Sequence, residues 1–132
     1  MRDYRRGLDY LQTRADIDMD RIGAIGYSMG AWQVYPLSAF ESRVKVSVAA
    51  ALPTEREKYD PVAAQNYAAG ITQPFLMQIG RQDEMASRES GEQLCALMPS
   101  AAKELIWYDG GHSLPVVYVA DAVAWFKAYL EP

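Results

Sequence analysis

The beginning of the chain has the hydrophobic spacing of an amphipathic helix. Apolar side chains recur every three or four positions at Tyr4, Leu8, Leu11 and Ala15, and Arg and Asp residues lie between them. We expect a helix that ends before residues 16–20, which read DIDMD. Its apolar face requires a packing partner.

Four short apolar runs later in the chain have the length and composition of β-strands. The second run is rich in Val, and polar and apolar residues alternate in the fourth. We expect strands at residues 21–27, 44–52, 74–80 and 103–109.

Helical patterns lie between and after these runs. One follows residue 28 and is expected to kink or end at Pro36, which has no N–H to donate. A second ends near Pro99 and places Cys95 toward the core. A third is expected from about Pro115 to Leu130, and it is apolar on most sides.

Strands separated by helices of this length require crossover connections, which are typical of parallel sheets. We therefore expect an α/β fold, with an open, mostly parallel sheet of about four strands and helices on both faces. The reactive cleft of such a sheet lies at the carboxyl ends of its strands. Residues 53–73 are polar and irregular, and we expect a surface excursion there with one short helix.

Composition and charge exclude several classes of function. The 132 residues suffice for one domain, and the formal net charge of −4 offers no basic patch for nucleic acid or an anionic membrane. A small-molecule substrate fits better. One His and one Cys cannot form an internal disulfide or an ordinary zinc cluster, so neither a metal nor another cofactor is expected. The first residues do not resemble a signal peptide, and no apolar stretch has the length of a membrane helix, so we expect a cytoplasmic protein.

Residues 26–30, which read GYSMG, carry the clearest chemical signal. A G-x-S-x-G segment between a strand and a helix forms a sharp turn that exposes the serine. We expect side chains at Gly26 and Gly30 to collide with neighbouring backbone, and Ser28 to project into the cleft.

A serine nucleophile requires a base, and His112 is the sole histidine of the chain. The imidazole in turn requires a carboxylate, for which Asp83 is the best candidate and Glu84 and Asp109 are substitutes. Simpler interpretations exist for both residues. His112 would then be a loop residue that caps the next helix, although Ser113 is the better candidate for that cap, and Asp83 would only stabilise a turn.

Three segments of the chain resemble the α/β-hydrolase fold, and within it the serine esterases similar to the dienelactone hydrolase family. They read DMDRIGAIGYSMGAW, DPVAAQNYAAGITQPFLMQIGRQDEM and YDGGHSLP. The resemblance implies that Ser28 is the nucleophile, His112 the general base and acid, and Asp83 the carboxylate that orients His112. It also implies that the backbone N–H of Met29 is an oxyanion-hole donor. Dienelactone hydrolases usually carry a cysteine nucleophile, so Ser28 favours ordinary esters.

The resemblance covers nearly all of this chain but only about the C-terminal half of the family's domain. We therefore expect residues 1–132 to form a single truncated α/β-hydrolase domain whose nucleophile strand has an unpaired edge. Two chains are expected to associate over this edge, most simply as a homodimer.

Tyr27 and Trp32 lie beside the nucleophile and are candidates for the wall of a substrate pocket, with packing as the alternative. Trp107, Trp125 and Phe126 are expected in the core. The sequence as a whole predicts a serine carboxylesterase for short-chain esters. The alternative is a non-catalytic half-domain that acts as an association or binding module.

Overall fold

The computed structural model describes residues 2–54, 60–61 and 63–131, and its centre is a sheet of four parallel strands. The strands follow one another in chain order across the sheet, so that β1 lies at one edge and β4 at the other. They are β1 (Ile22–Tyr27), β2 (Val44–Ala50), β3 (Phe75–Gly80) and β4 (Lys103–Tyr108). The predicted parallel sheet is confirmed.

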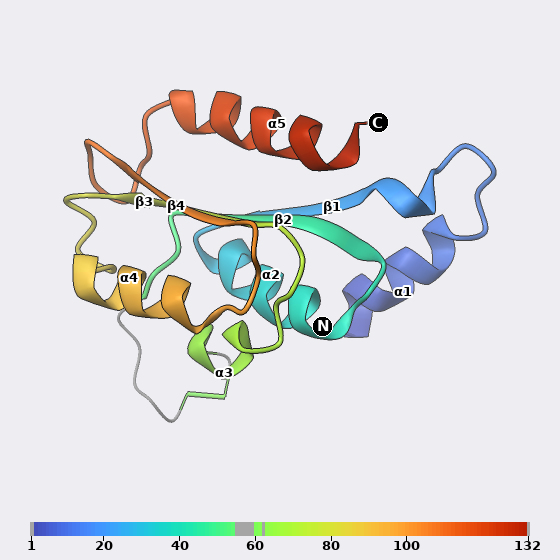
Figure 1. Ribbon diagram of the computed structural model, residues 1–132, viewed down its shortest axis with the longest axis horizontal. Coiled ribbons are helices and arrows are strands. Elements are labelled where there is room, and N and C mark those ends of the chain that lie inside the picture. Colours follow the sequence, from blue (N-terminus) through green and yellow to red (C-terminus); the bar gives the residue numbers. More distant parts are fainter. Residues whose placement is uncertain (1, 55–59, 62, 132) are drawn as a thin grey trace.

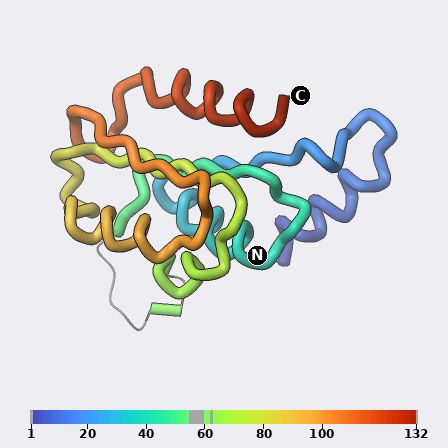
Figure 2. Tube along the Cα trace, in the orientation of Figure 1, coloured from blue at the N-terminus to red at the C-terminus, as the bar shows by residue number. Residues whose placement is uncertain are grey.

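Helices cover both faces of this sheet, as Figure 1 shows. One face carries α5 (Val117–Leu130) alone, and the other carries α2 (Met29–Phe40), α3 (Gln65–Ala68) and α4 (Arg88–Leu97). The two ends of the chain lie on opposite faces of the sheet (Figure 2). A short 3₁₀ helix (Met19–Arg21) leads into β1. None of the helices in the described ranges is long and apolar enough to cross a membrane.

The larger core lies between the sheet and the three helices α2, α3 and α4. All six residues of β3 are buried, as a strand covered on both faces requires. Cys95 and Trp107 pack against this core, and Trp125 and Phe126 pack against the smaller cluster under α5, as predicted. The largest buried side chains of the main cluster are Tyr35, Phe75, Leu52, Ile71, Met77, Ile79 and Met98.

The first helix, α1 (Arg2–Leu11), is shorter than predicted and does not include Ala15. Its last turn tightens, because the N–H groups of Thr13 and Arg14 bond to carbonyls only three residues earlier. The side chain of Arg14 then pairs with Asp16 at 2.6 Å, outside the helix.

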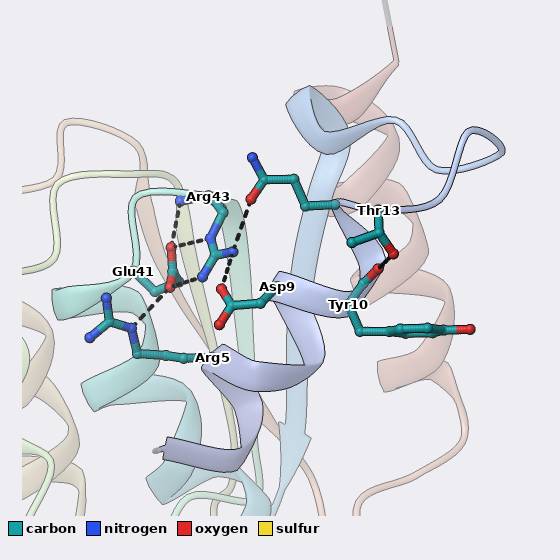
Figure 3. A network of polar contacts seen from close by, with 7 residues as sticks. Arg5, Asp9, Tyr10, Thr13, Glu41 and Arg43 are labelled. Carbon is teal, nitrogen blue, oxygen red and sulfur yellow. Dashed lines mark hydrogen bonds and ion pairs between the residues drawn. The ribbon is translucent and has the colours of Figure 1, made fainter.

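A network of charged side chains holds α1 against the turn between α2 and β2 (Figure 3). Arg43 lies 2.6 Å from Glu41 and 2.8 Å from Asp9, and Arg5 lies 3.2 Å from Glu41. The Glu41 side chain is only 4% exposed. Hydrogen bonds from Arg43 lower the pKa of this carboxyl from 4.5 to about 2. The network therefore joins the start of the chain to the sheet.

Two other expectations need correction. Pro36 does not end α2, which continues to Phe40, because buried side chains on both sides of Pro36 hold the helix to the sheet. The alternative expectation of a kink at Pro36 stays a prediction. Residues 53–73 contain the short helix α3 as predicted, but Ala64, Ala68 and Ile71 are buried in the core, so the segment is more than a surface excursion. Residues 55–59 and 62 lie outside the described part of the chain.

Candidate active site

Ser28 occupies a strained turn between β1 and α2. Its φ of 53° and ψ of −114° are unusual for a residue other than glycine, and such strain costs about 1–3 kcal/mol. Two backbone hydrogen bonds of 2.9 Å hold the turn, one from the N–H of Ser28 to Ala50 and one from Ala31 to the carbonyl of Ser28. The end of β2 and the start of α2 therefore fix the position of this serine.

The two glycines of the turn have different roles. An added Cβ at Gly26 would overlap the carbonyl group of Gly30, so only glycine fits there, as predicted. An added Cβ at Gly30 would meet no described atom within 4 Å apart from its chain neighbours and the backbone of its own helix. The predicted collision at Gly30 is therefore wrong, because this residue faces an open groove between α1 and β1.

The loop that carries His112 follows β4 and is pressed against the end of β3. Gly110 has a φ of +136°, which disfavours any side chain. An added Cβ at Gly80 would lie 2.6 Å from the carbonyl oxygen of Gly110. These close approaches bring the loop over the carboxyl end of the sheet, beside Ser28.

The structure brings Ser28, His112 and Asp83 into one row of hydrogen bonds. Nε2 of His112 lies 2.7 Å from Oγ of Ser28, and Nδ1 lies 2.9 Å from Oδ2 of Asp83. The other Asp83 oxygen accepts the N–H of Met85 at 2.9 Å. The Asp83 side chain is fully buried, whereas that of His112 is 30% exposed. A neutral ring protonated on Nδ1 satisfies both neighbours, donating to the carboxylate and accepting from the serine hydroxyl.

The substitute carboxylates lie elsewhere. The Asp109 side chain is 93% exposed and pairs with Arg81 at 3.3 Å, and Glu84 is exposed. Ser113 does not cap the last helix, so that expectation is wrong. The helix begins at Val117, four residues later, and has no side-chain cap within the described chain.

Tyr27, Met29 and Trp32 surround the serine in different ways. The Tyr27 hydroxyl bonds to the main chain of the His112 loop, and Nε1 of Trp32 donates to the carbonyl of Pro53 at 2.9 Å. Met29 is the first residue of α2 and is 71% exposed. The roles of Tyr27 and Trp32 in a substrate pocket, and of the Met29 N–H in an oxyanion hole, stay predictions.

A buried polar cluster below the His112 loop had no signal in the sequence. Nε2 of Gln78 donates to the Tyr108 hydroxyl at 2.9 Å and to the carbonyl of Tyr118 at 2.8 Å. The Tyr108 hydroxyl donates to Asp121 at 2.6 Å. Burial, reinforced by the bond to Asp121, raises the pKa of Tyr108. The cluster anchors α5 to β3 and β4, the strands that lead to Asp83 and His112.

The fold is similar to that of several solved esterases. The Pyrococcus furiosus esterase Pf2001 matches 97% of this chain with a TM-score of 0.85 and 19% identity, and the chain covers 61% of it. A cold-adapted esterase from an Arctic intertidal metagenomic library matches 98% of this chain with a TM-score of 0.84 and 25% identity, and the chain covers 57% of it. This chain therefore spans about three fifths of the length of these esterases.

Sequence comparisons point to the same class of protein. The Bacillus subtilis (strain 168) protein named "Putative hydrolase YtaP" is 49% identical over 41 residues, which are 31% of this chain and 14% of that protein. Residues 1–119 match the family described as Serine hydrolase (FSH1). The predicted resemblance to serine esterases of the α/β-hydrolase type is thereby confirmed, while the narrower link to dienelactone hydrolases stays a prediction. Because the family match spans most of the chain, the chain belongs to the Serine hydrolase (FSH1) family.

Proposed function

We propose that this chain is a serine carboxylesterase that hydrolyses short-chain esters through an acyl-enzyme, with residues 1–132 acting as one α/β-hydrolase domain. One observation carries the proposal. Asp83, His112 and Ser28 form a continuous row of hydrogen bonds of 2.9 and 2.7 Å at the carboxyl end of the sheet. Residues from three separate loops meet there in the order that nucleophilic acyl transfer requires.

In the proposed reaction, Oγ of Ser28 attacks the ester carbonyl carbon while Nε2 of His112 takes the hydroxyl proton. The tetrahedral intermediate collapses, the C–O bond to the alcohol breaks, and His112 returns the proton to the departing alcohol. Water then attacks the acyl-enzyme with His112 again as the base, which releases the acid and free Ser28. Asp83 holds the ring and stabilises its charged form. No cofactor takes part in this scheme.

The Met29 N–H is the proposed oxyanion donor. It follows Ser28 directly and lies in the first turn of α2, where backbone N–H groups have no partner within the helix. We assign Tyr27 and Trp32 to the pocket wall. Tyr27 and Met29 are 37% and 71% exposed, and this open setting supports short acyl chains on dissolved esters rather than long ones.

The test is hydrolysis of p-nitrophenyl acetate, butyrate and palmitate by the purified protein and by Ser28→Ala prepared identically. We expect turnover that is fastest for the short esters and that falls to the background rate in Ser28→Ala. Equal and negligible rates in both proteins would contradict the proposal. They would favour the alternative, a non-catalytic association or binding module.

We also propose that two chains pair through the free edge of β1. The N–H of Ser28 bonds to β2, and main-chain groups of successive strand residues point to opposite sides. Those of Gly23, Ile25 and Tyr27 therefore point away from β2, and no strand in the described ranges pairs with them. The strand contains no charged residue, and Ile25 is 55% exposed. A second copy of the chain would pair with this edge about a two-fold axis.

A cytoplasmic location stays a prediction from the sequence.

A further inference from the structure

The residue before Ser28 and the residue before Asp83 both bind the main chain of the loop that carries His112. Tyr27 precedes the serine at the end of β1, and Gln82 precedes the aspartate after β3. The two residues approach the loop on either side of His112. The same two segments that contact the imidazole ring therefore also contact the backbone that carries it.

Tyr27 bridges two main-chain groups across Ser113. Its hydroxyl donates to the carbonyl of His112 at 2.7 Å and accepts the N–H of Leu114 at 2.9 Å. The ring also lies edge-on to the imidazole, with centroids 6.2 Å apart. The Tyr27 hydroxyl thus donates one hydrogen bond to the loop and accepts another from it. A shift of His112 along the cleft would break both bonds.

Gln82 holds the loop two residues before His112. Its side-chain oxygen accepts the N–H of Gly110 at 2.5 Å, and its own N–H donates to the carbonyl of Gly110 at 2.9 Å. Gly110 and Gly111 have wide conformational freedom, so the loop needs external contacts to keep one shape. Gln82 supplies them before His112, and Tyr27 supplies them after it.

We propose that Tyr27 is a positioning residue, which fixes the imidazole of His112 between Ser28 and Asp83 by clamping the loop backbone, with Gln82 as the second clamp. This inference rests on the proposed esterase function for its effect on rate, but not for its effect on the loop. A displacement of about 1 Å at a reacting group lowers the rate about 10²-fold. Loss of the clamp therefore acts on kcat, whereas substrate binding at the cleft changes little.

The experiment compares Tyr27→Phe with wild type and with Tyr118→Phe as the matched control. The Tyr118 ring lies 5.5 Å from that of Tyr27, and its hydroxyl has no hydrogen bond within the described part of the chain. For p-nitrophenyl acetate we expect Tyr27→Phe to lower kcat about 10- to 100-fold, with KM within about twofold. Tyr118→Phe is expected to keep both constants within about twofold of wild type.

A second readout requires no activity. His112 is the only histidine, so the imidazole proton resonances in an NMR spectrum belong to one ring. We expect Tyr27→Phe to shift or broaden these resonances and to speed exchange of the Nδ1 proton, and Tyr118→Phe to leave them unchanged. Thermal unfolding of each variant shows whether the fold is intact. A purely structural role would lower the folded fraction without moving the imidazole signals of the folded protein.

The proposal is overturned if the His112 resonances of folded Tyr27→Phe match those of wild type. It is also overturned if the resonances move while kcat of an active enzyme stays within twofold. If wild type and Ser28→Ala are equally inactive, the proposed function fails, and the NMR comparison still decides whether Tyr27 holds the loop. If Tyr27→Phe does not fold, Gln82→Leu tests the clamp before His112, with the same changes expected.

Discussion

The carbonyl group of Gly30 lies directly against the Cα of Gly26, and these two residues are the ends of the five-residue turn around Ser28. An added Cβ at Gly26 would overlap that carbonyl and would lie 2.8 Å from the amide nitrogen of Ala31, whereas an added Cβ at Gly30 would meet no described atom within 4 Å apart from its chain neighbours and the backbone of its own helix. The contact shows how closely the chain folds back on itself to hold Ser28 at a φ of 53°. The two glycines therefore form a matched pair for mutation.

We expect Gly26→Ala to lower the free energy of unfolding by about 3 kcal/mol, because the backbone must move to admit one methyl group. Gly30→Ala is expected to keep or raise the stability by up to about 1 kcal/mol, since alanine favours the helix. Urea denaturation of both variants measures the difference. Equal losses would mean that the turn is not packed as described.

Asp83→Asn is expected to reduce kcat for p-nitrophenyl acetate by about 10³- to 10⁴-fold, because the amide no longer holds the ring in the required tautomer. Asp109→Asn is the control. Asp109 is exposed and pairs with Arg81, so its variant is expected to retain the wild-type kcat. The Asp83 assignment is contradicted if the two variants are equally active, or if Asp109→Asn loses more activity.

The Glu41 network makes the stability of the fold depend on pH. The pKa of the carboxyl is about 2 in the fold, below the ordinary value of 4.5. Its ionised form therefore stabilises the fold above about pH 4.5, and this contribution is lost as the pH falls toward about 2. We expect Glu41→Gln to lower the free energy of unfolding by about 2 kcal/mol at pH 7, with a difference from wild type that shrinks between about pH 5 and pH 2.

Urea denaturation across this pH range measures the effect of Glu41, and Glu92→Gln provides the comparison. The Glu92 carboxylate pairs with Arg88 at 3.1 Å, but the two side chains are 54% and 64% exposed. Its replacement is expected to change the stability by less than about 0.5 kcal/mol. A loss in Glu41→Gln that is the same at every pH would indicate packing rather than charge.

The free edge of β1 predicts a dimer, and a charged side chain placed on this edge is expected to disrupt the interface. We expect sedimentation equilibrium to give twice the mass of the chain, and Ile25→Lys to give the single mass, since two lysines near a two-fold axis repel each other. Wild type that is monomeric, soluble and active would contradict the dimer. So would an Ile25→Lys variant that keeps the mass of a dimer.

The fold and the meeting of Ser28, His112 and Asp83 could be predicted because both depend on local patterns. Alternating strands and helices imply a parallel sheet, and residues that follow strand ends gather at one edge. Ser28, Asp83 and His112 each follow a different strand, so their approach did not require knowledge of side-chain packing.

Contacts set by long-range packing could not be predicted in this way. Nothing near Tyr27 in the sequence indicates that its hydroxyl bonds to residues 112 and 114, because the strand end and the loop meet only in the folded chain. Gln78 lies in an apolar run and has no local sign of its partners on β4 and α5. The early end of α1 was missed for a different reason, because the apolar spacing of Ala15 gives no sign that Arg14 pairs with Asp16 just beyond the helix.

The most direct test of an activated nucleophile at Ser28 is covalent labelling by a fluorophosphonate. Oγ of Ser28 would form a bond to phosphorus, fluoride would leave, and His112 would take the hydroxyl proton. We expect mass spectrometry to find one adduct per wild-type chain, mapped to the peptide that contains Ser28, and none on Ser28→Ala or His112→Ala. An unlabelled wild-type chain, or labelling that persists in Ser28→Ala, would contradict the account.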